Sequence, residues 1–222
     1  MKLFARMSLM GLLAAAPVAA VSAPALACGN SYRYEIDPKT NLIVKAEEAL
    51  HEGQYDVAAK LAQDATGSIG KYVEGAKDPG GLGALRARGL RVAAIAAVKT
   101  DGKVDLAIPT PAQGAKTDLQ ANTLTWAVGQ LRVLGQREPG NPYLQARLAE
   151  GLAKDAGTAD EALAILAKLA SDDLMPDAAA WQLLAQLQAN KANAPERDKA
   201  LDQCKKRAHD PSICVVKNPG ET

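Results

Sequence analysis

The segment from Leu50 to Ala65 constrains the fold of this chain more than any other part of its sequence. It reads Leu-His-Glu-Gly-Gln-Tyr-Asp-Val-Ala-Ala-Lys-Leu-Ala-Gln-Asp-Ala, which is typical of the turn and second helix of a helical hairpin. Gly53 can adopt the backbone conformation of a tight turn, and Tyr55 is large enough to fill the gap between two helices. Ala58 and Ala65 allow those helices to approach closely. The segment therefore indicates two closely packed helices joined by a tight turn.

Helical periodicity continues on both sides of this turn. A first helix is expected from about Thr40 and a second from Gly53 through Ala65, with further helices at about 82–99 and 118–137. The apolar positions of the first helix recur at helical spacing; they are Leu42, Ile43, Ala46, Ala49 and Leu50. Alanine and leucine dominate the composition and aromatic residues make up only 4% of it, so the sequence predicts an all-α fold.

A long loop is expected from Asp101 to Lys116. A loop of this length without structure of its own is uncommon and is often functional or disordered. Within it, Val104 to Ile108 could form a short strand, but no pairing partner is evident in the sequence.

The hairpin resembles the tetratricopeptide repeat, in which a glycine, a tyrosine and two alanines stand at the offsets of Gly53, Tyr55, Ala58 and Ala65. Two further stretches carry the resemblance. In the first, residues 131–142 look like the end of one repeat running through its terminal proline into the next, with Leu148 and Ala149 at the family's Leu-small pair. In the second, Pro176 is followed by the family's Trp, Leu and small-residue positions, which are Trp181, Leu184 and Ala185.

The resemblance implies an α-solenoid of antiparallel helix pairs. The expected organisation is a signal peptide at 1–27, an extended lead-in at 28–38, a repeat domain at 39–211 and a tail at 212–222. Within the repeat domain, repeats are recognisable at about 39–72, 142–177 and 178–211, and the helices of 73–141 are degenerate. A generic helical bundle is the competing interpretation, but it gives no reason for prolines and small residues at repeat offsets.

The first helix of each pair lines a concave, partner-binding surface in proteins similar to this one. Carried over, the family's groove positions are Ile43, Glu47, His51, Ala146, Glu150, Lys154, Gln182, Gln186 and Asn190. This set is mixed in charge. It does not reproduce the lysine, arginine and asparagine clamp with which one subset of the family grips a peptide carboxylate, so chaperone binding is not implied.

The amino terminus has the features of a secretory signal peptide. Lys2 and Arg6 precede an apolar run, and the small-residue triplet Ala25-Leu26-Ala27 follows it. The run is shorter than the roughly 20 residues that span a bilayer, and no later segment is as long and uncharged. We therefore expect export to the periplasm or cell envelope, with no transmembrane span.

Cys28 directly follows the expected cleavage site. That is where bacterial lipoproteins are acylated, although the preceding Ala25-Leu26-Ala27 suits ordinary signal peptidase equally well. An unpaired cysteine in an exported protein favours acylation, which would supply a lipid anchor. Cys204 and Cys214 are expected to pair, because an oxidising compartment permits a disulfide and Pro211 lies between them to turn the chain back.

No catalytic or cofactor-binding signature stands out. The chain has 26 basic and 25 acidic residues, two of the basic ones in the leader, so the charge is close to neutral and does not favour nucleic acid. Residues 67–72 are similar to a phosphate-binding loop, yet they lack its first glycine and its Ser or Thr, and a loop between repeats is expected there. With two histidines and no Cys-x-x-Cys, no metal site or other cofactor is predicted.

We therefore expect a non-catalytic interaction scaffold or adaptor of the bacterial envelope that binds a protein or peptide. The alternative is an envelope protein that binds a small ligand or glycan in the groove or in the loop of 101–116. An enzyme ranks last, because no nucleophile, base and orienting group can be assembled from the sequence.

Overall fold

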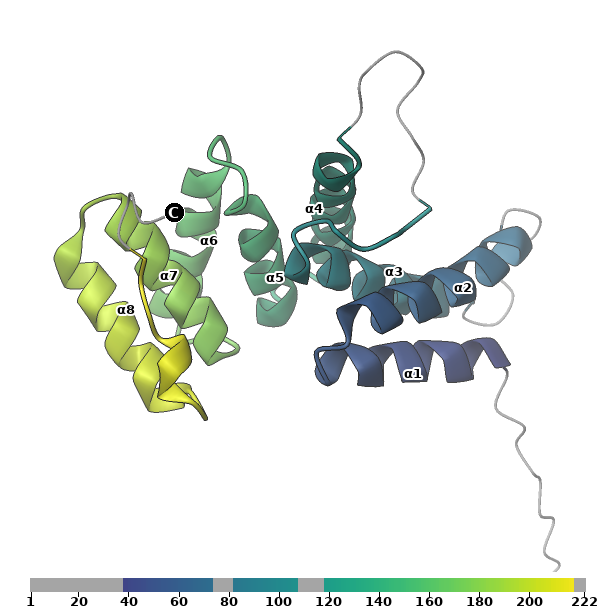
Figure 1. The fold of residues 1–222 in the computed structure, drawn as a ribbon, viewed down its shortest axis with the longest axis horizontal. Helices are drawn as coiled ribbons and strands as arrows, with labels where there is room; N and C mark the ends of the chain where they lie inside the picture. Colours follow the sequence, from purple (N-terminus) through teal and green to yellow (C-terminus); the bar gives the residue numbers. More distant parts are fainter. Residues whose placement is uncertain (1–37, 74–81, 108–117, 218–222) are drawn as a thin grey trace, which may run out of the picture. The chain divides into compact units, whose positions relative to one another are not determined.

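The computed structural model describes residues 38–73, 82–107 and 118–217, all of them within the compact unit Ile36–Thr222. They form eight α-helices and one short 3-10 helix, with no strand among them (Figure 1). The all-α prediction is confirmed for this part of the chain. The elements are α1 (Pro38–His51), α2 (Tyr55–Val73), α3 (Leu82–Lys99), α4 (Leu119–Arg137), α5 (Pro142–Leu152), α6 (Ala159–Ser171), α7 (Ala178–Asn190), α8 (Ala194–Arg207) and η2 (Pro211–Ile213).

Several predicted features lie outside the described residues. They are the signal peptide at 1–27, Cys28, the lead-in up to residue 37, and most of the loop after Asp101. Pro38, the last residue of that expected lead-in, already belongs to α1.

The turn between α1 and α2 is closed by Gly53, whose φ is 76°. The amide of Gln54 donates to the carbonyl of Ala49 at 2.8 Å and the amide of Gly53 donates to that of Leu50 at 3.2 Å. This pair of bonds caps the carboxyl end of α1, and it requires a residue that tolerates a left-handed backbone at the glycine position. Tyr55 is half-buried and packs against the adjoining core. The local chemistry of this turn therefore specifies a helical hairpin.

The second helix is longer than the sequence indicates, because α2 continues through Val73. The prediction that residues 67–72 form a loop is wrong. Each glycine in a helix costs about 1 kcal/mol relative to alanine, which is why Gly67 and Gly70 look like breakers. However, α2 packs along α3, and such tertiary contacts outweigh local propensity.

Helix α3 forms the centre of the amino-terminal core. Every residue from Val92 to Val98 is buried, so this half of the helix is apolar on all sides, as expected for a helix surrounded by others. Helices α1, α2, α4 and α5 all contact it. Most of the residues involved are alanines, whose small side chains permit close helix packing.

The helices contact one another in a regular pattern. Each helix packs against the next one along the chain, from α1 to α8. In addition, the odd-numbered helices contact each other in series, with α1 against α3, α3 against α5, and α5 against α7. Contacts between consecutive helices would also be present in a simple helical bundle. The contacts between the odd-numbered helices further restrict how the helices are arranged.

The carboxyl-terminal helices share a separate core that includes Leu166, Trp181, Leu184 and the two cysteines. Asn141 and Asp177 cap the amino ends of α5 and α7 by accepting backbone amides of those helices. Such caps typically contribute about 1 kcal/mol each. A disulfide joins Cys204 of α8 to Cys214, with 5.8 Å between their Cα atoms.

Residues 104–107, near the start of the predicted loop, lie against the helices. Val104 is buried, and the amide of Ala107 donates to Gln63 of α2 at 2.9 Å. Residues 104–107 form no strand. The described start of this loop therefore belongs to the amino-terminal core.

Candidate functional site

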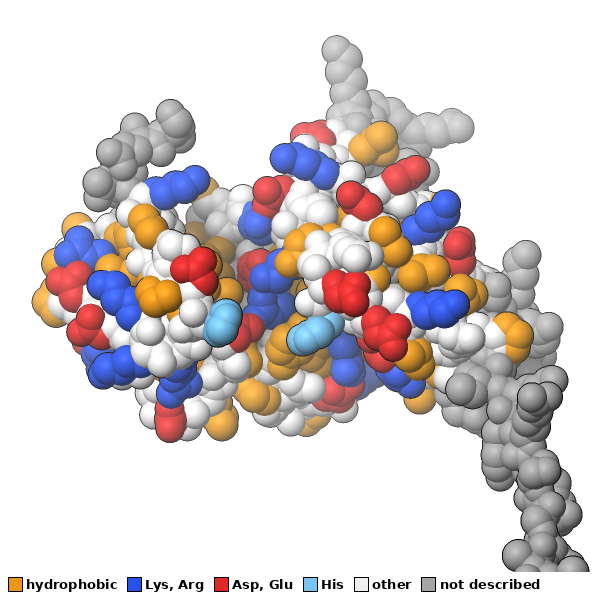
Figure 2. All heavy atoms as spheres, turned by 60° about the horizontal axis from the view of Figure 1, so that its bottom comes forward, with side chains coloured by type: hydrophobic (Ala, Val, Ile, Leu, Met, Phe, Trp, Pro, Cys, Tyr) orange, Lys and Arg blue, Asp and Glu red, His pale blue; other side chains and the backbone are white. Residues whose placement is uncertain are grey.

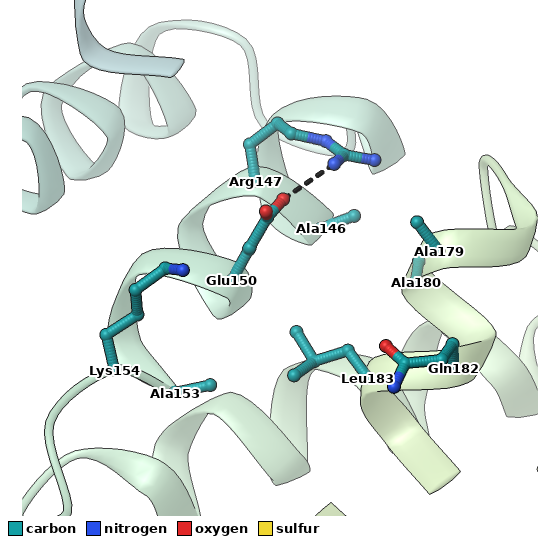
Figure 3. Close-up of a pocket in the computed structure, with 9 residues that line it drawn as sticks. All are labelled: Ala146, Arg147, Glu150, Ala153, Lys154, Ala179, Ala180, Gln182 and Leu183. Atoms are coloured by element: carbon teal, nitrogen blue, oxygen red, sulfur yellow. Dashed lines mark hydrogen bonds and ion pairs between the residues drawn. The ribbon is translucent and has the colours of Figure 1, made fainter. Parts of the chain in front are cut away.

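A pocket of about 260 Å³ lies between α5 and α7. Four of the predicted groove residues line it: Ala146, Glu150, Lys154 and Gln182. The full lining is Ala146, Arg147, Glu150, Ala153, Lys154, Ala179, Ala180, Gln182 and Leu183 (Figure 3). The structure thus brings together part of the set that the resemblance implied, all of it from the segments predicted as the second and third recognisable repeats.

The lining combines small apolar and charged side chains. Alanines on both helices and Leu183 supply apolar surface, and their small size leaves the space open. Glu150 projects from α5 and Lys154 from the turn that follows it, while Gln182 projects from α7 (Figure 3). A surface of this kind suits an apolar group bordered by polar ones.

Arg147 anchors the charged side of the pocket although only 3% of its surface is exposed. Its guanidinium donates from Nη1 to Glu150 at 2.6 Å and from Nη2 to Asp177. The same guanidinium stands over the ring of Tyr143, 5.1 Å from the ring centroid. Its Nε is buried without a hydrogen-bond partner. Asp177 also accepts the amide of Ala180 as the cap of α7, so this one carboxylate links α5 to the start of α7.

Ion pairs extend this network in both directions. The second oxygen of Glu150 receives the ammonium of Lys99 from α3 at 2.9 Å. Lys154 pairs with Asp101, which follows the end of α3. Each cation at the pocket therefore has an anionic partner within the chain, and the site presents no excess of either sign.

The hydroxyl of Tyr143 has a pKa raised above its ordinary value. Burial is the main cause, and the positive charge of Arg147 acts in the opposite direction. Tyr143 therefore remains protonated at neutral pH, as a neutral aromatic group at the edge of the site.

The first-repeat positions do not join this pocket. Ile43 has no exposed surface and packs with Ala65 in the core, so the expectation that it lines a groove is wrong. It belongs to the apolar stripe of α1 rather than to its outer face. Glu47 forms a two-bond pair with Arg88 of α3, at 2.9 and 2.5 Å, and His51 is exposed in the last turn of α1.

Gln186 and Asn190 lie on α7 beyond the pocket and are engaged by the chain itself. The C-terminal strap, residues 214–217, runs along α7 (Figure 1). Gln182 donates to the carbonyl of Val215 at 2.8 Å, and Gln186 donates to that of Lys217 at 2.9 Å. This contact was not predicted from the sequence. The disulfide alone suggested that the tail is held near the last helix.

Charges of both signs are interspersed on the face drawn in Figure 2. Across residues 38–73, 82–107 and 118–217, no group of three His, Cys, Asp or Glu side chains is placed to hold a metal ion. No helix in those same ranges is long and apolar enough to cross a membrane.

Comparison with known protein families, with curated proteins and with solved structures finds no match to this chain.

Proposed function

We propose that this chain is a non-catalytic interaction protein of the bacterial cell envelope, built of tetratricopeptide-like helix pairs, and that it binds a protein or peptide partner at the pocket between α5 and α7. The observation that carries the proposal is the series of contacts between the odd-numbered helices. In a stack of helix pairs, the first helices of successive pairs contact one another and line one surface. The pocket opens between two members of that series.

The size of the pocket supports a protein side chain as its occupant. Sites for small molecules usually measure about 300–1,000 Å³, whereas this pocket is about 260 Å³. An apolar side chain of a partner could fill the space between the alanines, with Glu150 and Lys154 at its border. The internal pairing of the charges favours such a group over a strongly charged ligand.

Export is supported by the sequence of the leader and by the disulfide. A disulfide persists in oxidising compartments such as the periplasm, and the chain carries one between Cys204 and Cys214. Attachment through lipid on Cys28 is part of the proposal. Intact-mass measurement of protein purified from bacterial membranes would show an acyl addition on a chain that begins at Cys28, and an unmodified mature chain would refute the anchor.

The binding site can be tested by photo-crosslinking in cells. Tyr143 is 41% exposed beside the pocket, so its replacement by p-benzoylphenylalanine keeps an aromatic group there. Val133 on α4, 45% exposed, is the matched control. We expect a discrete crosslinked partner from position 143 and none from 133. Equal crosslinking from both positions, or none from 143, would contradict the proposal.

The pocket itself is tested by a variant that fills it. Ala179 is exposed and lines the pocket, so A179W should occupy the space without disturbing the core. The crosslink from position 143 should then disappear while thermal stability is unchanged. A crosslink that persists would place the partner elsewhere.

A further inference from the structure

The C-terminal strap adopts an extended conformation on the surface of α7. Burial alternates along it, with Cys214 buried, Val215 60% exposed, Val216 half-buried and Lys217 exposed. This period of two is that of an extended chain. Val216 packs against the carboxyl-terminal core, so one side of the strap faces the helices and the other faces solvent.

The bonds from α7 to the strap are directed to its main chain. Gln182 donates a hydrogen bond to the main-chain carbonyl of Val215. Gln186 binds both main-chain polar groups of Lys217: it accepts a hydrogen bond from the amide at 2.8 Å and donates one to the carbonyl. The side chains of Val215 and Lys217 point to solvent and take no part in these bonds. Recognition of this kind does not depend on the identity of the bound residues.

The spacing of side chains along α7 matches the spacing of alternate residues in an extended chain. One step of four residues along α7 rises about 6 Å, and two residues of an extended chain span about 6.6 Å. Gln182 and Gln186 can therefore bind alternate residues of a peptide. Asn190 stands one further step along α7, and Gln186 donates to it at 3.1 Å. These three carboxamides form a ladder along the helix.

The ladder is continuous with the proposed binding site, since Gln182 also lines the pocket between α5 and α7. The strap covers the first two positions of the ladder. Its first residue is Cys214, which the disulfide fixes to α8. A tether this short keeps the strap at a high effective concentration beside Gln182 and Gln186.

We infer that the carboxamide ladder of α7 is a binding surface for an extended peptide, that the C-terminal strap is its built-in occupant, and that a partner peptide must displace the strap to bind there. This inference rests on the proposed function, because the proposed function places the binding of a partner at the pocket that Gln182 lines. Its test uses the strap sequence as the probe, so it can fail while crosslinking at position 143 succeeds, and the reverse.

The probe is a fluorescein-labelled peptide of residues 212–222 that carries C214S. The receptor is the full chain with its own strap released by C204S, C214S, V216D and K217P, which remove the tether, the apolar contact and the amide donor. We expect saturable binding to the released chain and at least tenfold weaker binding to the oxidised wild type. Adding Q182A and Q186A to the released chain should weaken binding at least tenfold. Absence of binding to the released chain, or binding insensitive to Q182A and Q186A, overturns the inference.

A second measurement does not depend on the folding of the released chain. Hydrogen exchange of the strap is compared between the wild type and Q182A/Q186A, both with the disulfide intact. We expect the Lys217 amide to exchange at least tenfold faster in the variant. Q188A is the matched control, because Gln188 lies on α7 but binds Asn193 instead of the strap. Unchanged exchange in Q182A/Q186A would refute the role of the ladder.

Discussion

Gly151 lies where α5 crosses two other helices, and replacing it by alanine tests the packing of the odd-numbered series. The residue is buried in α5. A Cβ atom built there would stand 2.9 Å from a methyl of Val128 in α4 and 3.1 Å from a methyl of Val98 in α3. Both distances are shorter than ordinary van der Waals contact. The close approach of α5 to these helices therefore depends on the missing side chain.

Neither neighbour can move aside easily. Valine in a helix is restricted to essentially one side-chain rotamer, and Val98 has no exposed surface. Forcing an extra methyl into such a site typically costs about 1–3 kcal/mol. The substitution also gains about 1 kcal/mol of helix propensity. We expect G151A to lower the free energy of unfolding by about 1 kcal/mol in net.

Gly129 supplies the matched control because it lies in the middle of α4 with no heavy atom within 4 Å of a built Cβ. G129A should gain the propensity term alone and stabilise the chain by about 1 kcal/mol. The two variants share this gain, so the difference between them isolates the steric term. That difference should be about 2 kcal/mol, which corresponds to about 4–8 °C in melting temperature for a domain of this size.

Thermal and urea unfolding of the two variants, followed by circular dichroism, measure this difference. A further variant, V128A in the G151A background, removes the methyl that stands closest to the new Cβ. It should show a favourable coupling of about 1 kcal/mol or more in a double-mutant cycle. If G151A is as stable as G129A, or if the coupling is absent, α5 does not approach α4 as described.

Two sets of substitutions test the site, and one titration tests the short helix η2 that precedes the strap. R147M should lower the free energy of unfolding, measured by urea titration, by about 1–3 kcal/mol. This is less than for a fully buried ion pair, because Asp177 is 38% exposed and keeps some solvation. An unchanged urea midpoint would refute the anchoring role of Arg147. D177A removes both the helix cap and the ion pair, whereas D177N keeps a side-chain oxygen for the cap. D177A should therefore be less stable than D177N by about 1 kcal/mol in the same assay. Equal stability of the two variants would show that the cap does not stabilise α7. The pKa of Asp210 is held below its ordinary value, mainly by the hydrogen bond from the Ser212 amide and also by that from the Ser212 hydroxyl. Because the pKa is lower in the folded chain, this stabilisation is complete above the unfolded pKa and is lost as the pH falls through the folded pKa. Carboxyl NMR should give a midpoint for Asp210 below about 3.9, and a midpoint at or above that value would contradict the cap on η2.

The helices could be predicted where local signals and packing agree. Helix α3 begins and ends where its apolar run predicts, between a glycine-rich segment and the turn at Asp101. The turn at Gly53 was predictable because its geometry needs a left-handed residue at one position. The end of α2 was not, because two glycines indicate a break locally, while the contact with α3 depends on how the two helices pack together. Local propensity carries no information about such a contact.

The residues of the candidate site could likewise be predicted only in part. Glu150, Lys154 and Gln182 were predicted from the resemblance to the tetratricopeptide repeat, and they do line the pocket. Arg147 has no such signal, since its partner Asp177 is 30 residues away and an arginine in a helix is usually exposed. Pairings of this kind depend on how helices pack, which spacing along one helix does not reveal.

The network around Arg147 also bears on how the pocket could respond to a partner. Asp177 caps α7 and binds Arg147 of α5 at the same time, so the start of α7 is tied to the middle of α5. Farther along, the strap binds α7 at Gln182 and Gln186, and nothing equivalent ties that part of α7 to α5 among the described bonds. Any adjustment of the pocket should therefore be small beside Asp177 and larger beside Gln182 and Leu183, the lining residues of α7 that lie farthest from Asp177. A partner that displaces the strap would act on the part of α7 that has no such bond to α5.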